Sequence, residues 1–226
     1  TDGTLWSWGD NERGILGHNN QTNYSSPKQV AGTTWSSGGS ISANNVGRFV
    51  KTDGTLWSWG GNSQGCLGLN QGDSVQPRSS PTQVGTDTTW KSSYGTAVNG
   101  NAQMALAVKT DGTLWSWGYN RGGTLGQNTQ GAGLPVSSPM QIGTGTDWST
   151  CKVTLGGGCF ATKSNGTAWS WGINYAGQLG HNQGASPYAG FDASAKYSSP
   201  TQIPGTNWEV ITGNYSWQTF GIRDQS

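Results

Sequence analysis

A nine-residue segment, Thr-Asp-Gly-Thr-Leu-Trp-Ser-Trp-Gly, occurs three times in this chain, and a close variant occurs a fourth time. Between the copies, four further landmarks recur in fixed order: a Gly-x-Leu-Gly segment, Ser-Ser-Pro, a Gln followed by Val or Ile, and a lone Trp. The first Trp-x-Trp-Gly positions fall at 6–9, 57–60, 115–118 and 169–172. A chain of such units, spaced by about 51–58 residues, is typical of repeat folds in which each unit packs against the next.

Each unit has the local signals of an antiparallel hairpin. Asp-Gly or Asn-Gly pairs favour tight turns because these residues tolerate a positive φ. Alternating apolar and polar residues lie on both sides of the pair, as in paired strands. In Leu-Trp-Ser-Trp-Gly the two indoles fall on one strand face, and Leu and Ser on the other. The sequence therefore predicts an all-β protein with almost no helix.

Composition limits the classes of partner. Charged residues make up 10% of the chain, the formal net charge is +1 and the pI is about 7.6. A nucleic-acid binder normally carries a basic face, so we expect no nucleic-acid partner. No apolar stretch approaches the roughly 18 residues of a membrane helix, so we expect no membrane insertion.

The ordered landmarks resemble a known family. The stretches 105–120 and 175–180 carry the pattern Lys-x-Asp-Gly-x-Leu-Trp-x-Trp-Gly-x-Asn and Gly-Gln-Leu-Gly. This pattern resembles the regulator-of-chromosome-condensation repeat, over essentially the whole chain. The resemblance implies a β-propeller of four-stranded blades, usually seven in that family. Many family repeats carry a His before the Asp-Gly turn, where this chain has Met104, Gly158 and Gln218. The nucleotide-exchange activity of the founding member is therefore not carried over.

Residues 1–226 form one repeat domain in this interpretation, and its number of blades stays open. The last residues, 219–226, align with 105–112, which precede and enter a hairpin turn. Joined to the first residues, they would complete one more unit and close a four-bladed ring. Alternatively, the four repeats are part of a larger propeller, since propellers have 4 to 8 blades.

We find no pattern that indicates catalysis, a cofactor or a metal. His18 and His181 both follow a Gly-x-Leu-Gly segment, so they are interpreted as loop residues rather than as metal ligands. Cys151 and Cys159 could face each other across a hairpin, and we favour free thiols over a disulfide because the count of three cysteines is odd. The chain is therefore predicted not to be an enzyme and to bind no cofactor.

Twelve of the 13 tryptophans occupy equivalent positions in the repeats, and we expect them to form the core rather than a sugar-binding platform. Trp8, Trp59, Trp117 and Trp171 in particular are predicted to be buried. Trp217 is the exception, and it is a candidate binding residue.

The segment between Gly-x-Leu-Gly and Ser-Ser-Pro varies most, and loops on a rigid scaffold commonly carry function. Its longest copy, 181–197, contains Tyr188, Phe191 and Tyr197, which we predict as binding residues together with Trp217. The alternative is an insertion whose aromatic side chains fold back on the blade.

The sequence thus predicts a non-enzymatic binding or structural module on a virion, a cell surface or a secreted protein. Its expected partner is a protein or a glycan, with possible assembly of further copies or flanking domains. Two alternatives stay open: a glycan-binding lectin, and an enzyme regulator such as an inhibitor or a nucleotide-exchange factor.

Overall fold

The computed structural model describes residues 2–42, 45–72, 77–92, 104–129, 135–154, 156–182, 196–213 and 218–224. Its strands are β1 (Leu5–Gly9), β2 (Tyr24–Val30), β3 (Trp35–Ser42), β4 (Val46–Lys51), β5 (Leu56–Gly60), β6 (Arg78–Gln83), β7 (Met104–Val108), β8 (Leu114–Gly118), β9 (Val136–Gln141), β10 (Trp148–Val153), β11 (Gly158–Lys163), β12 (Ala168–Ile173), β13 (Lys196–Gln202), β14 (Trp208–Gly213) and β15 (Thr219–Arg223). The helical segments in these ranges are single 3-10 turns, η1 (Glu12–Gly14), η2 (Ser63–Gly65) and η3 (Arg121–Gly123). The all-β prediction is confirmed. None of the helical segments in these ranges is long and apolar enough to cross a membrane.

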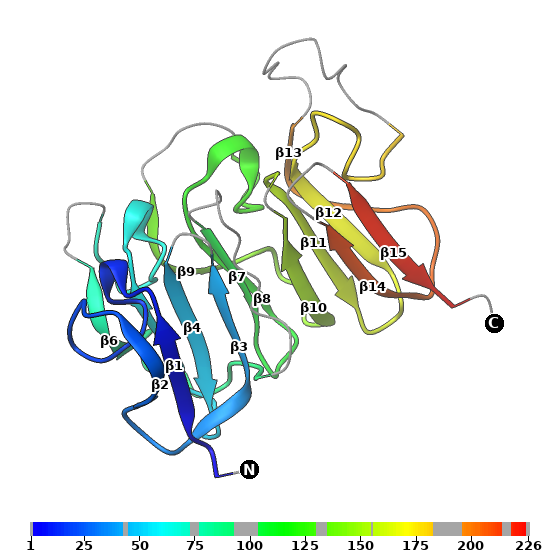
Figure 1. The fold of residues 1–226 in the computed structure, drawn as a ribbon. Coiled ribbons are helices and arrows are strands. Elements are labelled where there is room, and N and C mark those ends of the chain that lie inside the picture. The colour runs from blue at the N-terminus through cyan, green and yellow to red at the C-terminus, as the bar shows by residue number, and fades with distance from the viewer. Residues whose placement is uncertain are drawn as a thin grey trace.

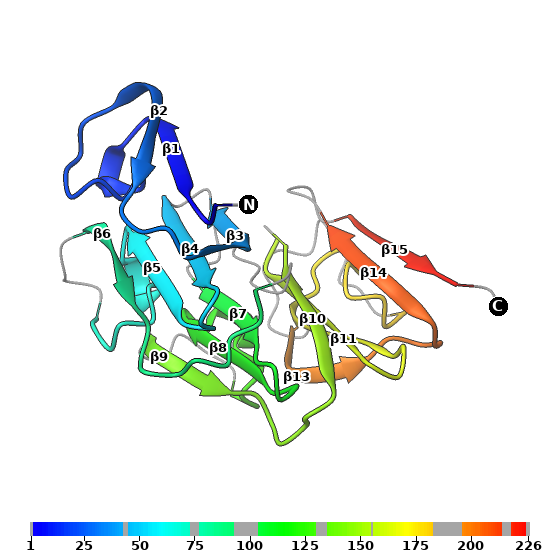
Figure 2. The same ribbon diagram turned by 90° about the horizontal axis from the view of Figure 1, so that it is seen from below.

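The strands form antiparallel sheets that follow one another as the blades of a propeller do. We call them blade 1 (β1–β2), blade 2 (β3–β6), blade 3 (β7–β9), blade 4 (β10–β13) and blade 5 (β14–β15). Figures 1 and 2 show the blades side by side around an open arc, with blade 1 at one end and blade 5 at the other. In the described ranges β1 pairs with β2, and β15 pairs with β14. The first strand, β1, does not pair with the last strand, β15, in these ranges. The structure is therefore an open arc rather than a closed four-bladed ring.

The predicted turns and edges lie where the sequence placed them. Asp53-Gly54 joins β4 to β5, and Gly54 has a φ of 79°. The corresponding pairs join β7 to β8 and β11 to β12. The Ser-Ser-Pro segments lie in β2, β6, β9 and β13, the last strand of each blade, where a proline at a sheet edge removes no ladder hydrogen bond.

The hydrophobic core lies between the blades. Leu56 and Val84 of blade 2 cluster with Trp117 of blade 3, and Leu114 of blade 3 clusters with Trp171 of blade 4. In each case the face of β5 or β8 that carries Leu meets the face of the next blade that carries the tryptophans. Each inner blade thus buries one face against its predecessor and the other against its successor.

A hydrogen bond between side chain and backbone fixes each of these junctions. The second indole of the repeat donates its N–H to a carbonyl oxygen of the preceding blade: Trp59 to Ile15 at 2.6 Å, Trp117 to Cys66 at 3.0 Å and Trp171 to Thr124 at 2.9 Å. The accepting residue is the variable position of Gly-x-Leu-Gly. Its last glycine allows the close approach, because a Cβ on Gly68 would lie 2.8 Å from the Trp117 indole nitrogen.

A second contact joins the same pairs of blades. The backbone N–H of Asn70, which has a φ of 56°, donates to the Ser137 carbonyl of the next blade at 2.7 Å. Ser138 Oγ of that blade donates to Asn70 Oδ1 at 3.2 Å. Asn19 and Asn128 make equivalent contacts at the neighbouring junctions. At each of these junctions, the loop after Gly-x-Leu-Gly of one blade contacts the edge strand of the next blade.

The blades at the ends of the arc have no neighbour on one side, which corrects one prediction. Trp8, expected to be buried, is 58% exposed, and Trp6 is 49% exposed. Trp59, Trp117 and Trp171 are buried as predicted. The difference arises because Trp8 faces the side where a preceding blade would pack.

Replacing Trp117 with Ala should lower the free energy of unfolding by about 3–5 kcal/mol, since it removes a fully buried indole. Trp8→Ala is the matched control at the equivalent position of an end blade. It should cost roughly 1 kcal/mol or less, because exposed substitutions are usually mild. Urea denaturation followed by circular dichroism measures both. Equal losses in the two variants would contradict the assignment of the core to the junctions between blades.

Candidate functional site

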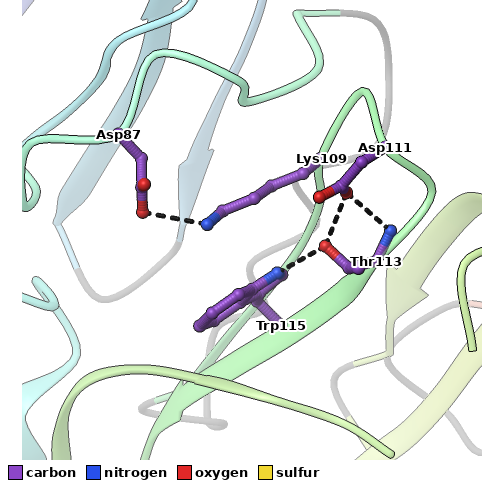
Figure 3. Close-up of polar contacts among 5 residues, drawn as sticks. All are labelled: Asp87, Lys109, Asp111, Thr113 and Trp115. Atoms are coloured by element: carbon purple, nitrogen blue, oxygen red, sulfur yellow. Dashed lines mark hydrogen bonds and ion pairs between the residues drawn. The ribbon is translucent and has the colours of Figure 1, made fainter. Parts of the chain in front are cut away.

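A polar relay lies at the hairpin turn of every repeat. In blade 3, Asp111 Oδ1 accepts hydrogen bonds from the Thr113 hydroxyl at 2.7 Å and the Thr113 backbone N–H at 3.0 Å. The Thr113 hydroxyl oxygen accepts in turn from the Trp115 indole N–H at 2.8 Å (Figure 3). The threonine bonds lower the pKa of the Asp111 carboxyl, because they stabilise its charged form. The relay holds the first indole of the repeat in a fixed orientation.

A lysine lies over this indole. Lys109 Nζ is 3.8 Å from the centre of the Trp115 ring and 4.8 Å from that of Trp90, which are cation–π contacts. It also forms an ion pair with Asp87 at 2.9 Å, and its side chain is only 7% exposed (Figure 3). In blade 4, Lys163 lies over Trp148 and Trp169 and pairs with Asp147 at 3.0 Å. In both blades, the lysine is therefore neutralised by an aspartate from the connection that leads to the lone Trp of the same blade.

Blade 2 has the lysine without this aspartate. Lys51 Nζ lies 3.8 Å from the centre of the Trp57 ring and 5.0 Å from that of Trp35. Among the described residues, no carboxylate forms an ion pair with it. The position opens onto a cleft of about 570 Å³ between blades 1 and 2, which is lined by Lys51, Trp57, His18 and Lys28 among other residues. This cleft is the candidate functional site.

The two histidines have structural partners. His181 Nε2 lies 2.8 Å from Ser170 Oγ, whose own hydroxyl donates to the Leu179 carbonyl at 2.7 Å, so the imidazole donates to the serine. His18 has the same relation to Ser7 at 3.0 Å. Burial lowers the pKa of both imidazoles below the ordinary value of 6.5, and at His18 the charge of Lys28 adds to this effect. The described residues contain no group of three or more His, Cys, Asp or Glu side chains placed to hold a metal ion.

The three cysteines are buried and none of them forms a disulfide, as favoured from the odd count. Cys151 and Cys159 lie on neighbouring strands but are not partners in the register, where Cys151 faces Ala161 and Cys159 faces Val153. Cys159 Sγ instead donates to the Thr124 carbonyl of blade 3 at 3.3 Å. Burial raises the pKa of the Cys159 thiol. These thiols belong to the packing between blades.

Of the predicted binding residues, Tyr188, Phe191 and Trp217 lie outside the described residues. Tyr197 lies in β13 rather than in a loop, and its ring is 4.9 Å from that of His181. It packs on the clusters at both junctions of blade 4. Tyr24 makes the equivalent contact with His18 at 5.1 Å.

The cationic groups of the cleft were missed from the sequence. The signal was present as a difference between repeats: an aspartate precedes the lone Trp in the units that contain Trp90 and Trp148, and none does so before Trp35. The buried position of Arg48 was also not predicted from the sequence. Its guanidinium is fully buried, donates to the Cys66 carbonyl, and has its pKa lowered by burial to about 10.

Blades of antiparallel strands that pack face to face around an arc define a β-propeller built from sequence repeats. The family model described as "Regulator of chromosome condensation (RCC1) repeat" matches the chain at residues 2–42 and 53–93. In its repeats and in its fold, the chain is similar to the RCC1-like β-propeller repeat proteins.

Known proteins of this kind are similar to the chain over much of its length. Human Protein RCC2 is 32% identical over 133 residues, which are 58% of this chain and 24% of RCC2. The human E3 ubiquitin-protein ligase HERC2 is 28% identical over 189 residues, 80% of this chain and 4% of HERC2. The crystal structure of Prp20p from Saccharomyces cerevisiae superimposes with a TM-score of 0.71 at 18% identity, covering 98% of this chain and 52% of Prp20p. The chain thus spans about a quarter of RCC2 and about half of Prp20p.

These relatives overturn the predicted location on a virion, a cell surface or a secreted protein, which is wrong. Prp20p was studied for its binding to Gsp1p and histones, and HERC2 is a ubiquitin-protein ligase. Histones and ubiquitin ligases act inside cells. The partners named for Prp20p are proteins rather than glycans. The expectation of no nucleic-acid partner stays a prediction.

The lowered pKa of His181 predicts a dependence of stability on pH. Because the unfolded state binds the proton more readily than the folded state, this residue should destabilise the fold as the pH falls below about 6.5. Gln127 occupies the same position in blade 3 and donates to the Ser116 oxygen at 3.4 Å. His181→Gln should therefore keep the stability at pH 7 and reduce its loss between pH 7 and 5, as measured by urea denaturation. An identical pH profile in both proteins would contradict this role.

Proposed function

We propose that this chain is a regulatory module that binds other proteins and carries out no chemistry of its own. The observation that carries the proposal is the match of two segments to the RCC1 repeat, together with a structural similarity to Prp20p that covers 98% of this chain and 52% of Prp20p. Prp20p binds Gsp1p and histones. Among the functions that the sequence left open, this favours the regulator of another protein over a structural module displayed on a surface.

The absence of catalysis is part of the proposal. HERC2 is a ubiquitin-protein ligase, but the chain matches only 4% of its length. Such a short match supports a shared propeller rather than a shared reaction. Glycan binding stays a weaker alternative, because the second indoles of the repeats in blades 2 to 4 serve the packing between blades and are held by internal hydrogen bonds.

We further propose that the variable segments between the Gly-x-Leu-Gly and Ser-Ser-Pro landmarks contribute to recognition. The strands and turns repeat almost unchanged, whereas segment 181–197 is much longer than its counterparts in the other repeats. A longer loop adds only modest closure entropy, so the scaffold tolerates it. Tyr188 and Phe191 remain its proposed anchors, and Trp217 a separate candidate.

Immobilised Gsp1p and core histones should each be titrated with the chain in biolayer interferometry. We expect saturable binding to at least one of them, because a shared propeller scaffold supports a shared kind of partner. Release of labelled GDP from Gsp1p in the same samples separates an exchange factor from a simple binder. No binding to either protein, with saturable binding on a glycan array, would replace the proposal by the lectin alternative.

Shortening segment 181–197 to the seven residues of 18–24 should leave the melting temperature nearly unchanged, because the conserved turn and strand on either side are kept. Binding to whichever of Gsp1p or histones the parent chain recognises should weaken. The control is to replace segment 69–78 in the same way. Unchanged binding by a folded 181–197 variant would exclude this loop as a recognition site. The surface around Trp217 would then be the next candidate.

A further inference from the structure

The repeats provide an internal comparison for the cleft between blades 1 and 2. In blades 3 and 4, an aspartate from the connection before the lone Trp neutralises the lysine. Counting back from that Trp, Asp87 corresponds to Gly32, and Asp147 corresponds to Thr34. Both positions that supply a carboxylate elsewhere lack one in the connection that reaches Trp35. Lys51 therefore lies over two indoles, as Lys109 and Lys163 do, but this connection provides no aspartate to pair with it.

A second cation is particular to this cleft. Lys28 follows the first Ser-Ser-Pro, where the other repeats have Thr82, Met140 and Thr201. It is exposed, its Nζ donates to the Tyr24 hydroxyl at 2.8 Å, and it lines the same cleft as Lys51. None of the described residues that line the cleft is an aspartate or a glutamate.

One carboxylate does act on Lys51 from outside the cleft. Asp53 has a lowered pKa, chiefly through its bonds to Thr55 and in smaller part through the charge of Lys51. Its Oδ1 accepts from the Thr55 hydroxyl at 2.6 Å and from the Thr55 N–H at 3.0 Å. Asp111 is placed in the same way beside Lys109, which is paired with Asp87 in addition. Asp53 therefore does not replace the missing ion-pair partner.

We propose that this cleft binds an acidic segment of a protein partner, with an Asp or Glu carboxylate in the place that Asp87 and Asp147 fill in the next two blades. The inference rests on the proposed protein-binding function and names the chemistry of one contact. The chain itself shows that a carboxylate suits this site, since Lys–Asp pairs of 2.9 and 3.0 Å form over the same kind of indole. Lys28 provides the second charge for a neighbouring acidic residue.

The walls of the cleft suit a peptide. Trp35, Trp57, Ala31 and Pro81 line it together with the two lysines, so apolar surface is available for the stems and neighbours of the acidic side chains. A volume of about 570 Å³ lies in the range of ordinary ligand sites. The Trp57 indole N–H is already bonded to Thr55, so the ring offers its apolar surface rather than a donor.

The test uses a labelled peptide of alternating Gly and Asp residues, with acetylated and amidated ends, in fluorescence anisotropy at low salt. The chain should bind it, with an affinity that falls as salt is added, and should not bind the same peptide with Asn in place of Asp. Thr34→Asp places a carboxylate where Asp147 stands in blade 4, and this carboxylate should pair with Lys51. It should weaken binding about tenfold or more, because it occupies the site and repels the peptide.

Thr89→Asp is the matched control. It makes the same charge change at the equivalent exposed position before Trp90, where Lys109 is already paired with Asp87, and it should leave the affinity nearly unchanged. Lys28→Thr, the residue of two other repeats, should weaken binding severalfold and provides the test if Thr34→Asp fails to fold.

Three outcomes would overturn the inference: no binding of the Asp peptide, equal effects of Thr34→Asp and Thr89→Asp, or preferential binding of a short single-stranded oligonucleotide at this cleft. The last would assign the cleft to phosphate. Gsp1p and histone binding by the Thr34→Asp variant separates the two proposals. If the parent chain does not bind the Asp peptide, and the Thr34→Asp variant still binds Gsp1p or histones at full strength, the regulatory module stands and the acidic contact falls.

Discussion

The hydrogen bond from the second indole of each repeat to a backbone carbonyl of the preceding blade is the interaction on which the architecture depends. It recurs at 2.6, 3.0 and 2.9 Å across three successive junctions. An indole buried there without this acceptor would lose a hydrogen bond that water provides in the unfolded chain. The same indole fills the space between two sheets, so one side chain provides the apolar contact and fixes the spacing of the blades.

Much of this arrangement could be predicted from the sequence because the deciding signals are local. Asp-Gly or Asn-Gly pairs, alternating strands and Ser-Ser-Pro edges each depend on a few adjacent residues, and they occur four times. The exposure of Trp8 could not be predicted in this way. Trp8 and Trp117 stand in the same nine-residue context, and only the presence of a preceding blade makes one of them buried.

The cleft shows a different limit of sequence reasoning. Asp147 and Lys163 are brought together across the antiparallel strands β10 and β11, and Asp87 reaches Lys109 from the connection before blade 3. The lack of an aspartate in the connection before Trp35 can be read from the sequence. It becomes informative only when the structure places Lys51 over the Trp57 indole. Repeats that agree almost everywhere define the scaffold, and the few positions where they disagree are where this chain departs from charge balance.

The carbonyl that receives each indole belongs to the variable residue of Gly-x-Leu-Gly, which is Ile15, Cys66 or Thr124 in successive units. Because the acceptor is backbone, no unit has to match the identity of its neighbour's side chain at this point. Whole units are therefore interchangeable parts: an extra copy inserted in the gene, or one removed, would meet compatible acceptors on both sides. The arc can change in length by duplication or loss of a unit without coordinated substitutions elsewhere.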